Sequence, residues 1–155
     1  MRFEVARDVA APRAEVWRLL TTWERQPDWM LDAVAVEVVT PERVGAGVVV
    51  RCPTRILGMV VDDVMRVTAW REPAVLEVVH LGRVIRGTGA FELVDIDAGR
   101  TRVVWQEEVE PPLGALGAWG AQWLVRPVLI RVFARSLARF AALVEAEAGA
   151  DRKAS

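Results

Sequence analysis

Residues 129–144 read LIRVFARSLARFAALV, and their apolar side chains recur every three or four positions. Arg131, Arg135 and Arg139 fall on the opposite side of the same helical repeat. This spacing is typical of an amphipathic α-helix that buries one face and leaves the other in water. The face expected to be buried holds Leu129, Val132, Phe133, Ser136, Leu137, Phe140 and Val144.

The segment Thr101–Val109 alternates apolar and polar side chains, which predicts a strand with one face in the core. Trp105 and Glu107 fall on the inward face, and Gln106 and Glu108 fall on the outward face. Short connections between strands favour antiparallel pairing. Turn sequences recur upstream, and they predict strands over residues 33–40, 44–52, 59–70, 75–80 and 84–94.

The N-terminal segment predicts a further strand and two short helices. Arg2–Val9 alternates like a half-buried strand, and Pro12 suits the first turn of the helix that follows. Gln26-Pro27 interrupts the helical pattern, which restarts around Trp29. Seven strands and one amphipathic helix together predict an α+β fold in which a curved antiparallel sheet curls around the C-terminal helix.

Length and composition predict one folded domain over residues 1–148, followed by a disordered tail over 149–155. A chain of 155 residues can bury a core without metals or disulfides. Hydrophobic residues make up 53% of the chain and charged residues 26%, which excludes the composition of a disordered protein. The net charge of −1 argues against nucleic acid as a partner, because such proteins carry a basic surface.

Cys52 is the only cysteine, which excludes an intramolecular disulfide and a zinc site built from cysteine clusters. No metal and no cofactor are predicted. Charged residues interrupt the N-terminus where an export signal needs an apolar run, so the expected location is the cytoplasm. The longest apolar stretch, residues 113–133, contains Gln122, Arg126 and Arg131, so we expect no membrane span.

Several segments resemble START-like proteins of the polyketide cyclase/dehydrase group, in the SRPBCC superfamily. The resemblance lies in residues 11–20 (APRAEVWRLL), in Pro27-Asp28-Trp29, in the strand Gly87–Leu93, in Gly99–Val103 and in the long closing helix. It covers nearly the whole chain and implies the helix-grip fold. Proteins of this kind include lipid and quinone carriers, aromatase/cyclases, plant ligand binders and chaperone activators.

The resemblance implies an apolar hollow between the sheet and the helix, and the composition of the chain offers residues to line it. There are seven tryptophans and no tyrosine. Large rigid indole rings can hold a flat or greasy ligand, although each one can equally fill core. The predicted ligand-binding residues are Trp29, Met30, Arg51, Met65, Val78, His80, Phe91, Trp105, Glu107, Trp123 and Val132.

His80 and Glu107 are the polar candidates on the inward face. His80 alternates with Leu76 and Val78, and it can serve as an acid, a base or a hydrogen-bond anchor. The alternative is a histidine satisfied by backbone or water. Glu107 is expected to pair with Asp63, His80 or Arg51 if it is buried, and otherwise to be an exposed strand end or a structural ion pair.

The remaining charged residues favour a solvated surface. Asp62-Asp63, Asp95 with Asp97, and Glu107-Glu108 are interpreted as surface charge, because neighbours in a strand point to opposite faces. Arg131, Arg135 and Arg139 could attract anionic lipid headgroups or a partner protein, and a solvated helix face is the alternative. Cys52 is interpreted as a small buried hydrophobe.

Three classes of function follow from these features. The first is binding or transport of a hydrophobic small molecule such as a lipid, a quinone or a polyketide-like compound. The second is a polyketide aromatase/cyclase that promotes aldol closure and dehydration, and the absence of tyrosine weakens that analogy. The third is an interaction protein acting on a chaperone or ribosome. The sequence does not indicate an oligomeric state, and a transient contact with a membrane surface stays open.

Overall fold

The structure is a computed structural model that describes residues 1–56, 58–110 and 125–154, with Ala154 described by its backbone alone. Its helices are α1 (Arg13–Leu20), the 3₁₀ turn η1 (Trp23–Arg25), α2 (Gln26–Trp29) and α4 (Arg126–Ala154). Its strands are β1 (Arg2–Val9), β2 (Glu37–Val38), β3 (Val49–Ile56), β4 (Met59–Arg71), β5 (Val75–Leu81), β6 (Arg86–Asp97) and β7 (Arg100–Val109).

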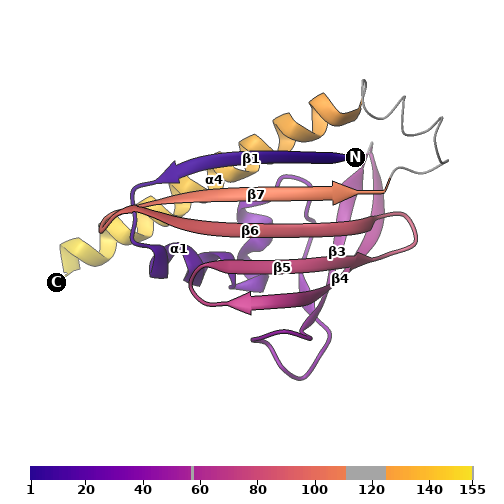
Figure 1. Cartoon of the computed structure of the whole chain (residues 1–155), viewed down its shortest axis with the longest axis horizontal. Coiled ribbons are helices and arrows are strands. Elements are labelled where there is room, and N and C mark those ends of the chain that lie inside the picture. The colour runs from indigo at the N-terminus through magenta and orange to yellow at the C-terminus, as the bar shows by residue number, and fades with distance from the viewer. Residues whose placement is uncertain (57, 111–124, 155) are drawn as a thin grey trace.

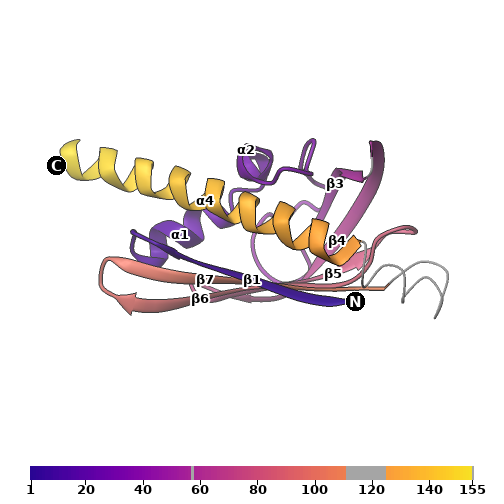
Figure 2. The ribbon, with the colours of Figure 1, turned by 90° about the horizontal axis from the view of Figure 1, so that it is seen from above.

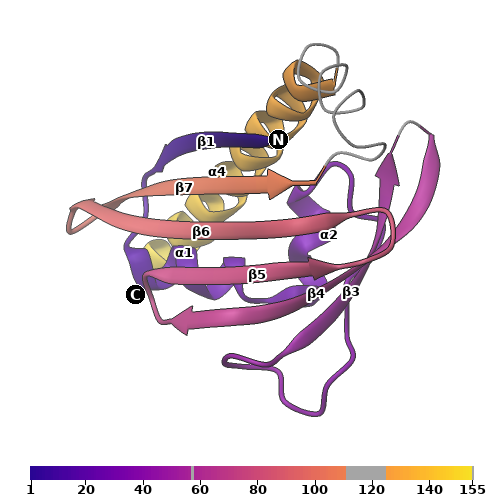
Figure 3. The same ribbon diagram turned by 45° about the vertical axis from the view of Figure 1, so that its right-hand side comes forward.

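The strands form one antiparallel sheet of seven in the order β1-β7-β6-β5-β4-β3-β2. The first strand therefore pairs with the last, and α1, η1 and α2 carry the chain from one edge of the sheet to the other (Figure 1). All the helices lie on one side of the sheet (Figure 2). The strands β3 and β4 bend away from the plane of the others (Figure 3), so the sheet is curved as predicted.

The predicted strands match the structure best where side chains alternate strictly. In β1, Phe3, Val5 and Val9 are buried and the residues between them are exposed. The strand predicted over residues 33–40 is wrong in length, because only Glu37–Val38 forms a strand within it, apart from an isolated bridge between Ala33 and Thr54. The strand predicted over 44–52 begins five residues later, at Val49. Gly45 and Gly47 adopt φ of +101° and +94°, which an extended strand does not allow.

The helix α4 packs its apolar stripe against β1, α1 and α2. Ser136, Leu137, Phe140 and Val144 are buried, as the periodicity of this segment predicted. The hydroxyl of Ser136 accepts a hydrogen bond from the backbone N–H of Leu31, over 3.1 Å, and so ties the loop after α2 to α4. These contacts place the C-terminal helix over the concave side of the sheet.

The C-terminal helix is longer than predicted. It runs to Ala154, whereas the sequence predicts an irregular segment after residue 148. Ala148 is buried at 1% exposure, and the residues after it include good helix formers such as Ala150 and Arg152, which let the helix continue. The division into a domain and a tail stays a prediction.

No helix in the described part of the chain is long and apolar enough to cross a membrane.

Candidate functional site

An aromatic cluster joins the concave side of the sheet to the helices. Trp29 of α2 lies with its ring 4.9 Å from Phe140 of α4 and 5.9 Å from Trp105 of β7. Trp105 in turn stacks on Phe91 of β6 at 4.8 Å and meets Phe133 of α4 edge-on at 4.2 Å. Ring contacts at these distances leave no room for a ligand between the rings.

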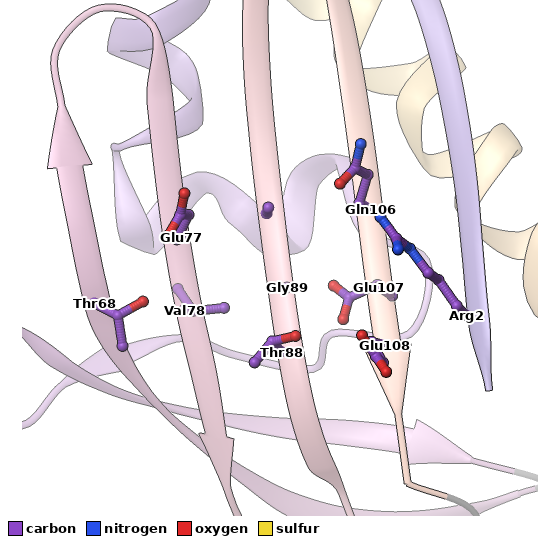
Figure 4. A pocket seen from close by; sticks show the side chains of 10 residues that line it. Arg2, Thr68, Glu77, Val78, Thr88, Gly89, Gln106, Glu107 and Glu108 are labelled. Atoms are coloured by element: carbon purple, nitrogen blue, oxygen red, sulfur yellow. The ribbon is translucent and has the colours of Figure 1, made fainter.

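These rings therefore contact one another where a hollow between the sheet and the helix was expected. Two depressions lined by described residues lie elsewhere. One is beside Asp8 and Arg102, and the other opens over Thr88, Gly89 and Gln106 (Figure 4). Trp29 and Trp105, two of the tryptophans expected to border the hollow, pack against each other with their rings 5.9 Å apart.

A polar cluster lies on the same side of the sheet. His80 of β5 is hydrogen-bonded through Nδ1 to Asp63 of β4, with 2.9 Å to Oδ2, and through Nε2 to Oε2 of Glu107 of β7 at 3.3 Å. All three residues are buried, at 9%, 5% and 7% exposure respectively. The cluster therefore holds two carboxylates and the only histidine of the chain away from water.

A glycine allows this cluster to form, because His80 and Glu107 sit on strands that are not neighbours. β6 runs between β5 and β7, and it places Gly87 opposite His80 and Gly89 opposite Glu107. The carboxylate of Glu107 extends toward Gly89 (Figure 4), and a Cβ at position 89 would lie 2.7 Å from its Oε1. The absence of a side chain at Gly89 thus opens a path from β7 to β5.

The polar and aromatic clusters share one hydrogen bond. The indole Nε1 of Trp105 donates to Oε1 of Glu107 over 2.8 Å. Glu107 consequently accepts from Trp105 with one oxygen and meets His80 with the other. This arrangement fixes the Trp105 ring relative to the charged groups. Movement of a side chain in one cluster therefore shifts the side chains of the other.

His80 is held in its charged form. Burial by itself disfavours the imidazolium, but the hydrogen bonds and negative charges of Asp63 and Glu107 outweigh it and raise the pKa of His80 to about 10. Both ring nitrogens then donate, each to a carboxylate. The cluster thus pairs a buried imidazolium with the side chains of Asp63 and Glu107.

Asp32 and Cys52 lie close enough to this cluster for their charges to be coupled to it. Burial raises the pKa of Asp32, and the charges of Glu107 and Asp63 raise it further. Its Oδ1 is buried and has no hydrogen-bond partner among the described residues. Burial also raises the pKa of the Cys52 thiol to about 11, which makes it a buried, unreactive group as predicted.

The structure places most of the predicted site residues toward the interior. His80 and Glu107 do pair, as one of the predicted alternatives has it, whereas Asp63, which was predicted as a partner of Glu107, pairs with His80 instead. Trp29, Met65 and Trp105 are buried, and the remaining apolar candidates Met30, Val78, Phe91 and Val132 are half-buried. Trp123 lies outside the described residues. Whether any of these residues binds a ligand stays a prediction.

Three predictions about the polar residues are wrong. Arg51 does not reach Glu107, because Cys52 and Thr54 take the buried positions of β3 and leave Arg51 exposed, where it donates to Asp62 at 2.8 Å. Asp63 and Glu107 are buried and are not surface charge. His80 is satisfied by carboxylates, not by backbone or water.

One member of the site, Asp32, was not predicted from the sequence. Asp32 sits in an irregular loop with no periodicity to assign it a face. The burial of Asp63, by contrast, could have been inferred from its alternation with Met65 and Val67, which are both buried.

Within residues 1–56, 58–110 and 125–154, no three His, Cys, Asp or Glu side chains are arranged to hold a metal ion. The groups of the site are carboxylates that accept hydrogen bonds and an imidazolium that donates them. A polar group on a ligand could replace the long Nε2–Oε2 contact of 3.3 Å, which is the weaker of the two bonds to His80.

A curved antiparallel sheet closed by a long C-terminal helix is the helix-grip architecture, and solved structures share it. The protein TTHA0849 of Thermus thermophilus superposes with a TM-score of 0.80 at 20% identity, covering 95% of this chain and 99% of its own. The Zhui aromatase/cyclase of Streptomyces sp. R1128 superposes with a TM-score of 0.78 at 20% identity, covering 94% and 93%. These identities show a common fold and no more.

The family is shown by the sequence match. Residues 1–145 match the family described as polyketide cyclase/dehydrase and lipid transport, and the chain belongs to it. A START superfamily protein of Mycobacterium smegmatis is also similar, with a TM-score of 0.67 at 15% identity over 96% of this chain and 97% of its own. No curated protein matches the chain.

Proposed function

We propose that this protein binds a hydrophobic small molecule at the concave side of the sheet, with the aromatic cluster holding its apolar part and the Asp63–His80–Glu107 cluster facing a polar group. The observation that carries the proposal is the burial of three ionisable side chains against the aromatic cluster. Burying charges costs free energy even when they are paired, and an apolar set of the same size is often more stable. A role in recognition would account for their presence.

The packing of the rings makes this an induced site. A ligand must displace Trp29 or Phe133, whose rings now meet their neighbours at 4.9 and 4.2 Å. Burial of roughly 300 Å² of apolar ligand surface at about 25 cal/mol per Å² provides about 7 kcal/mol before the costs of ordering and ring displacement. Affinity in the micromolar range or weaker is therefore expected. Cytoplasmic location, inferred from the sequence, belongs to the same proposal.

Native mass spectrometry of freshly purified protein tests this proposal. A compound that co-purifies in stoichiometric amount and is released on unfolding would support it. Val78→Phe adds volume on the concave side of β5, and Val79→Phe adds the same volume on the opposite face of the same strand. We expect the first variant to lose the compound and the second to retain it. Equal retention by both variants, or a protein that carries nothing and binds no extracted lipid, quinone or aromatic ketone, would refute the proposal.

Aromatase/cyclase chemistry is the second candidate, and the polar cluster is the observation that favours it. Aldol closure requires a proton to be removed from a carbon beside a carbonyl and another to be delivered to oxygen. Asp32 and Glu107 can accept a proton, and the imidazolium of His80 can deliver one. Feeding a poly-β-carbonyl intermediate to the protein and to the Glu107→Gln variant tests this. Identical product profiles with the native protein, the variant and no protein would exclude the activity.

A further inference from the structure

The outward face of α4 carries a row of arginines. Arg131, Arg135 and Arg139 are exposed and follow one another at intervals of four residues. In the described part of the chain none of them forms an ion pair. Residues 57, 111–124 and 155 contain no acidic side chain that could supply one. The row is thus a set of unneutralised positive charges on a chain whose net charge is −1.

Helical geometry gathers these charges into one stripe. At 100° per residue, Arg131, Arg135 and Arg139 lie within one narrow sector, and Phe140 and Val144 lie on the far side of the helix. Their Cα atoms span about 12 Å along the axis at 1.5 Å per residue. All three arginines are exposed, so this sector of α4 is accessible. The stripe therefore presents a flat, accessible row of guanidinium groups.

The acidic residues nearest to this stripe are turned away from it. Glu145 accepts a hydrogen bond from the backbone N–H of Ala10 at 2.9 Å. Glu147 pairs with Arg18 at 3.1 Å and with Arg25. Both carboxylates are thereby bound to the segment that leads from β1 into α1 and α2. Neither of these acids competes with an external anion for the arginines.

Apolar side chains are exposed beside the arginines at the start of α4. Val128, in the same sector as the stripe, is 50% exposed, and Val125 is 39% exposed. Leu31, whose backbone is bonded to Ser136 of α4, is 40% exposed. Basic residues next to exposed aliphatic side chains are the composition of a helix that lies on a membrane surface, where guanidinium groups meet phosphates and aliphatic groups enter the headgroup boundary.

We propose that α4 docks this protein on an anionic phospholipid surface through Arg131, Arg135 and Arg139, with Val125, Val128 and Leu31 entering the interface. The positive stripe is complementary to lipid phosphates, and the aliphatic residues beside it favour a lipid surface over a nucleic acid, which offers no apolar layer to receive them. The residues directly before Arg135 and Arg139 are alanines, which do not obstruct a flat surface. This docking goes beyond the proposed ligand binding and does not depend on it.

Vesicle flotation with the full chain tests the proposal. The probes are phosphatidylcholine vesicles with and without about one quarter phosphatidylglycerol. The variant R131Q/R135Q/R139Q is compared with R2Q/R55Q/R66Q, which removes the same charge from exposed arginines on the strands of the sheet. Each basic residue near an anionic surface is worth about fivefold in partitioning, so the α4 variant should lose on the order of 100-fold and the control little.

Further measurements test whether α4 docks on anionic lipid. Binding of the native chain should weaken when NaCl rises from about 0.1 to about 0.5 M, because screening shortens the reach of the charges. Equal binding to neutral vesicles, or an equal loss in the two triple variants, would overturn the proposal. Retention on heparin or DNA without flotation on anionic vesicles would also overturn it and would assign the stripe to a polyanion. Circular dichroism of both variants confirms that the fold is retained.

Discussion

Gly89 of β6 stands directly opposite Glu107 of β7, and a Cβ at position 89 would lie 2.7 Å from Oε1 and 3.1 Å from Oε2 of the glutamate. The carboxylate occupies the space that any other residue at position 89 would fill. Through this space Glu107 reaches His80, two strands away. The buried charged cluster thus depends on a residue that has no side chain.

Gly89→Ala should uncouple Glu107 from His80. The added methyl group displaces the carboxylate, so the imidazolium loses one of its two partners, and the pKa of His80 should fall by about one unit or more. The chain has a single histidine, so one pair of imidazole signals in an NMR titration reports the change. Gly99→Ala is the control, because its Cβ would meet no atom closer than 3.9 Å. An unchanged pKa in Gly89→Ala would contradict this account.

Asp63 should stabilise the charged form of His80 more than Glu107 does. Both oxygens of Asp63 lie within 3.0 Å of Nδ1, whereas the nearer oxygen of Glu107 lies 3.3 Å from Nε2. Asp63→Asn should therefore lower the pKa of His80 more than Glu107→Gln does, as measured by the same NMR titration. Glu107→Gln should also shift the indole N–H signal of Trp105, which donates to this side chain. The opposite order of pKa values would show that the longer contact is the stronger one.

Stability should decrease as the pH rises above neutrality. The pKa of His80 is about 10 in the folded protein against an ordinary value of 6.5, so the folded state holds this proton more tightly than the unfolded chain. The resulting stabilisation is complete below about pH 6.5 and is lost as the pH approaches 10. Between pH 6.5 and 9 the free energy of unfolding should fall by about 3 kcal/mol.

Urea denaturation between pH 6.5 and 9 measures this loss of unfolding free energy. Asp63→Asn serves as the comparison, because the unfolding free energy of this variant should depend less steeply on pH. The interval ends at pH 9 because the Cys52 thiol, whose pKa burial raises to about 11 from 9.0, contributes above it. A free energy of unfolding that is constant or rises from pH 6.5 to 9 would disprove the assignment of a charged His80.

Ser136→Ala should loosen the loop after α2. The change removes the acceptor of the Leu31 N–H, and an unpaired, partly buried donor costs about 1–2 kcal/mol. We expect a lower urea midpoint and faster hydrogen exchange at the Leu31 amide. Ala142→Ser, at an exposed position on the same helix, should change stability by less than about 0.5 kcal/mol. Equal effects of the two changes would mean that the Ser136 hydrogen bond contributes nothing.

Much of the fold was predictable because its elements carry strong periodicity. Thr101–Val109 alternates clearly, and β7 spans nearly the same residues. The same reasoning directed His80 and Glu107 inward, as the structure confirms. The reasoning failed where backbone conformation overrides side-chain pattern, as at Gly45 and Gly47 before β3. It also failed for Arg51, although the predicted burial of Cys52 implies that its neighbour in the strand points outward.

The sequence by itself determined which residues form strands and helices and which side of each element is apolar, because these are properties of neighbouring residues along one chain. The tertiary structure decided which of the inward side chains meet. His80 and Glu107 are joined only because the strand between theirs, β6, has Gly89 opposite Glu107, and Trp29 fills the interior only because α2 folds back over the sheet. These side-chain contacts depend on strand order and on the curvature of the sheet, which no local sequence pattern encodes.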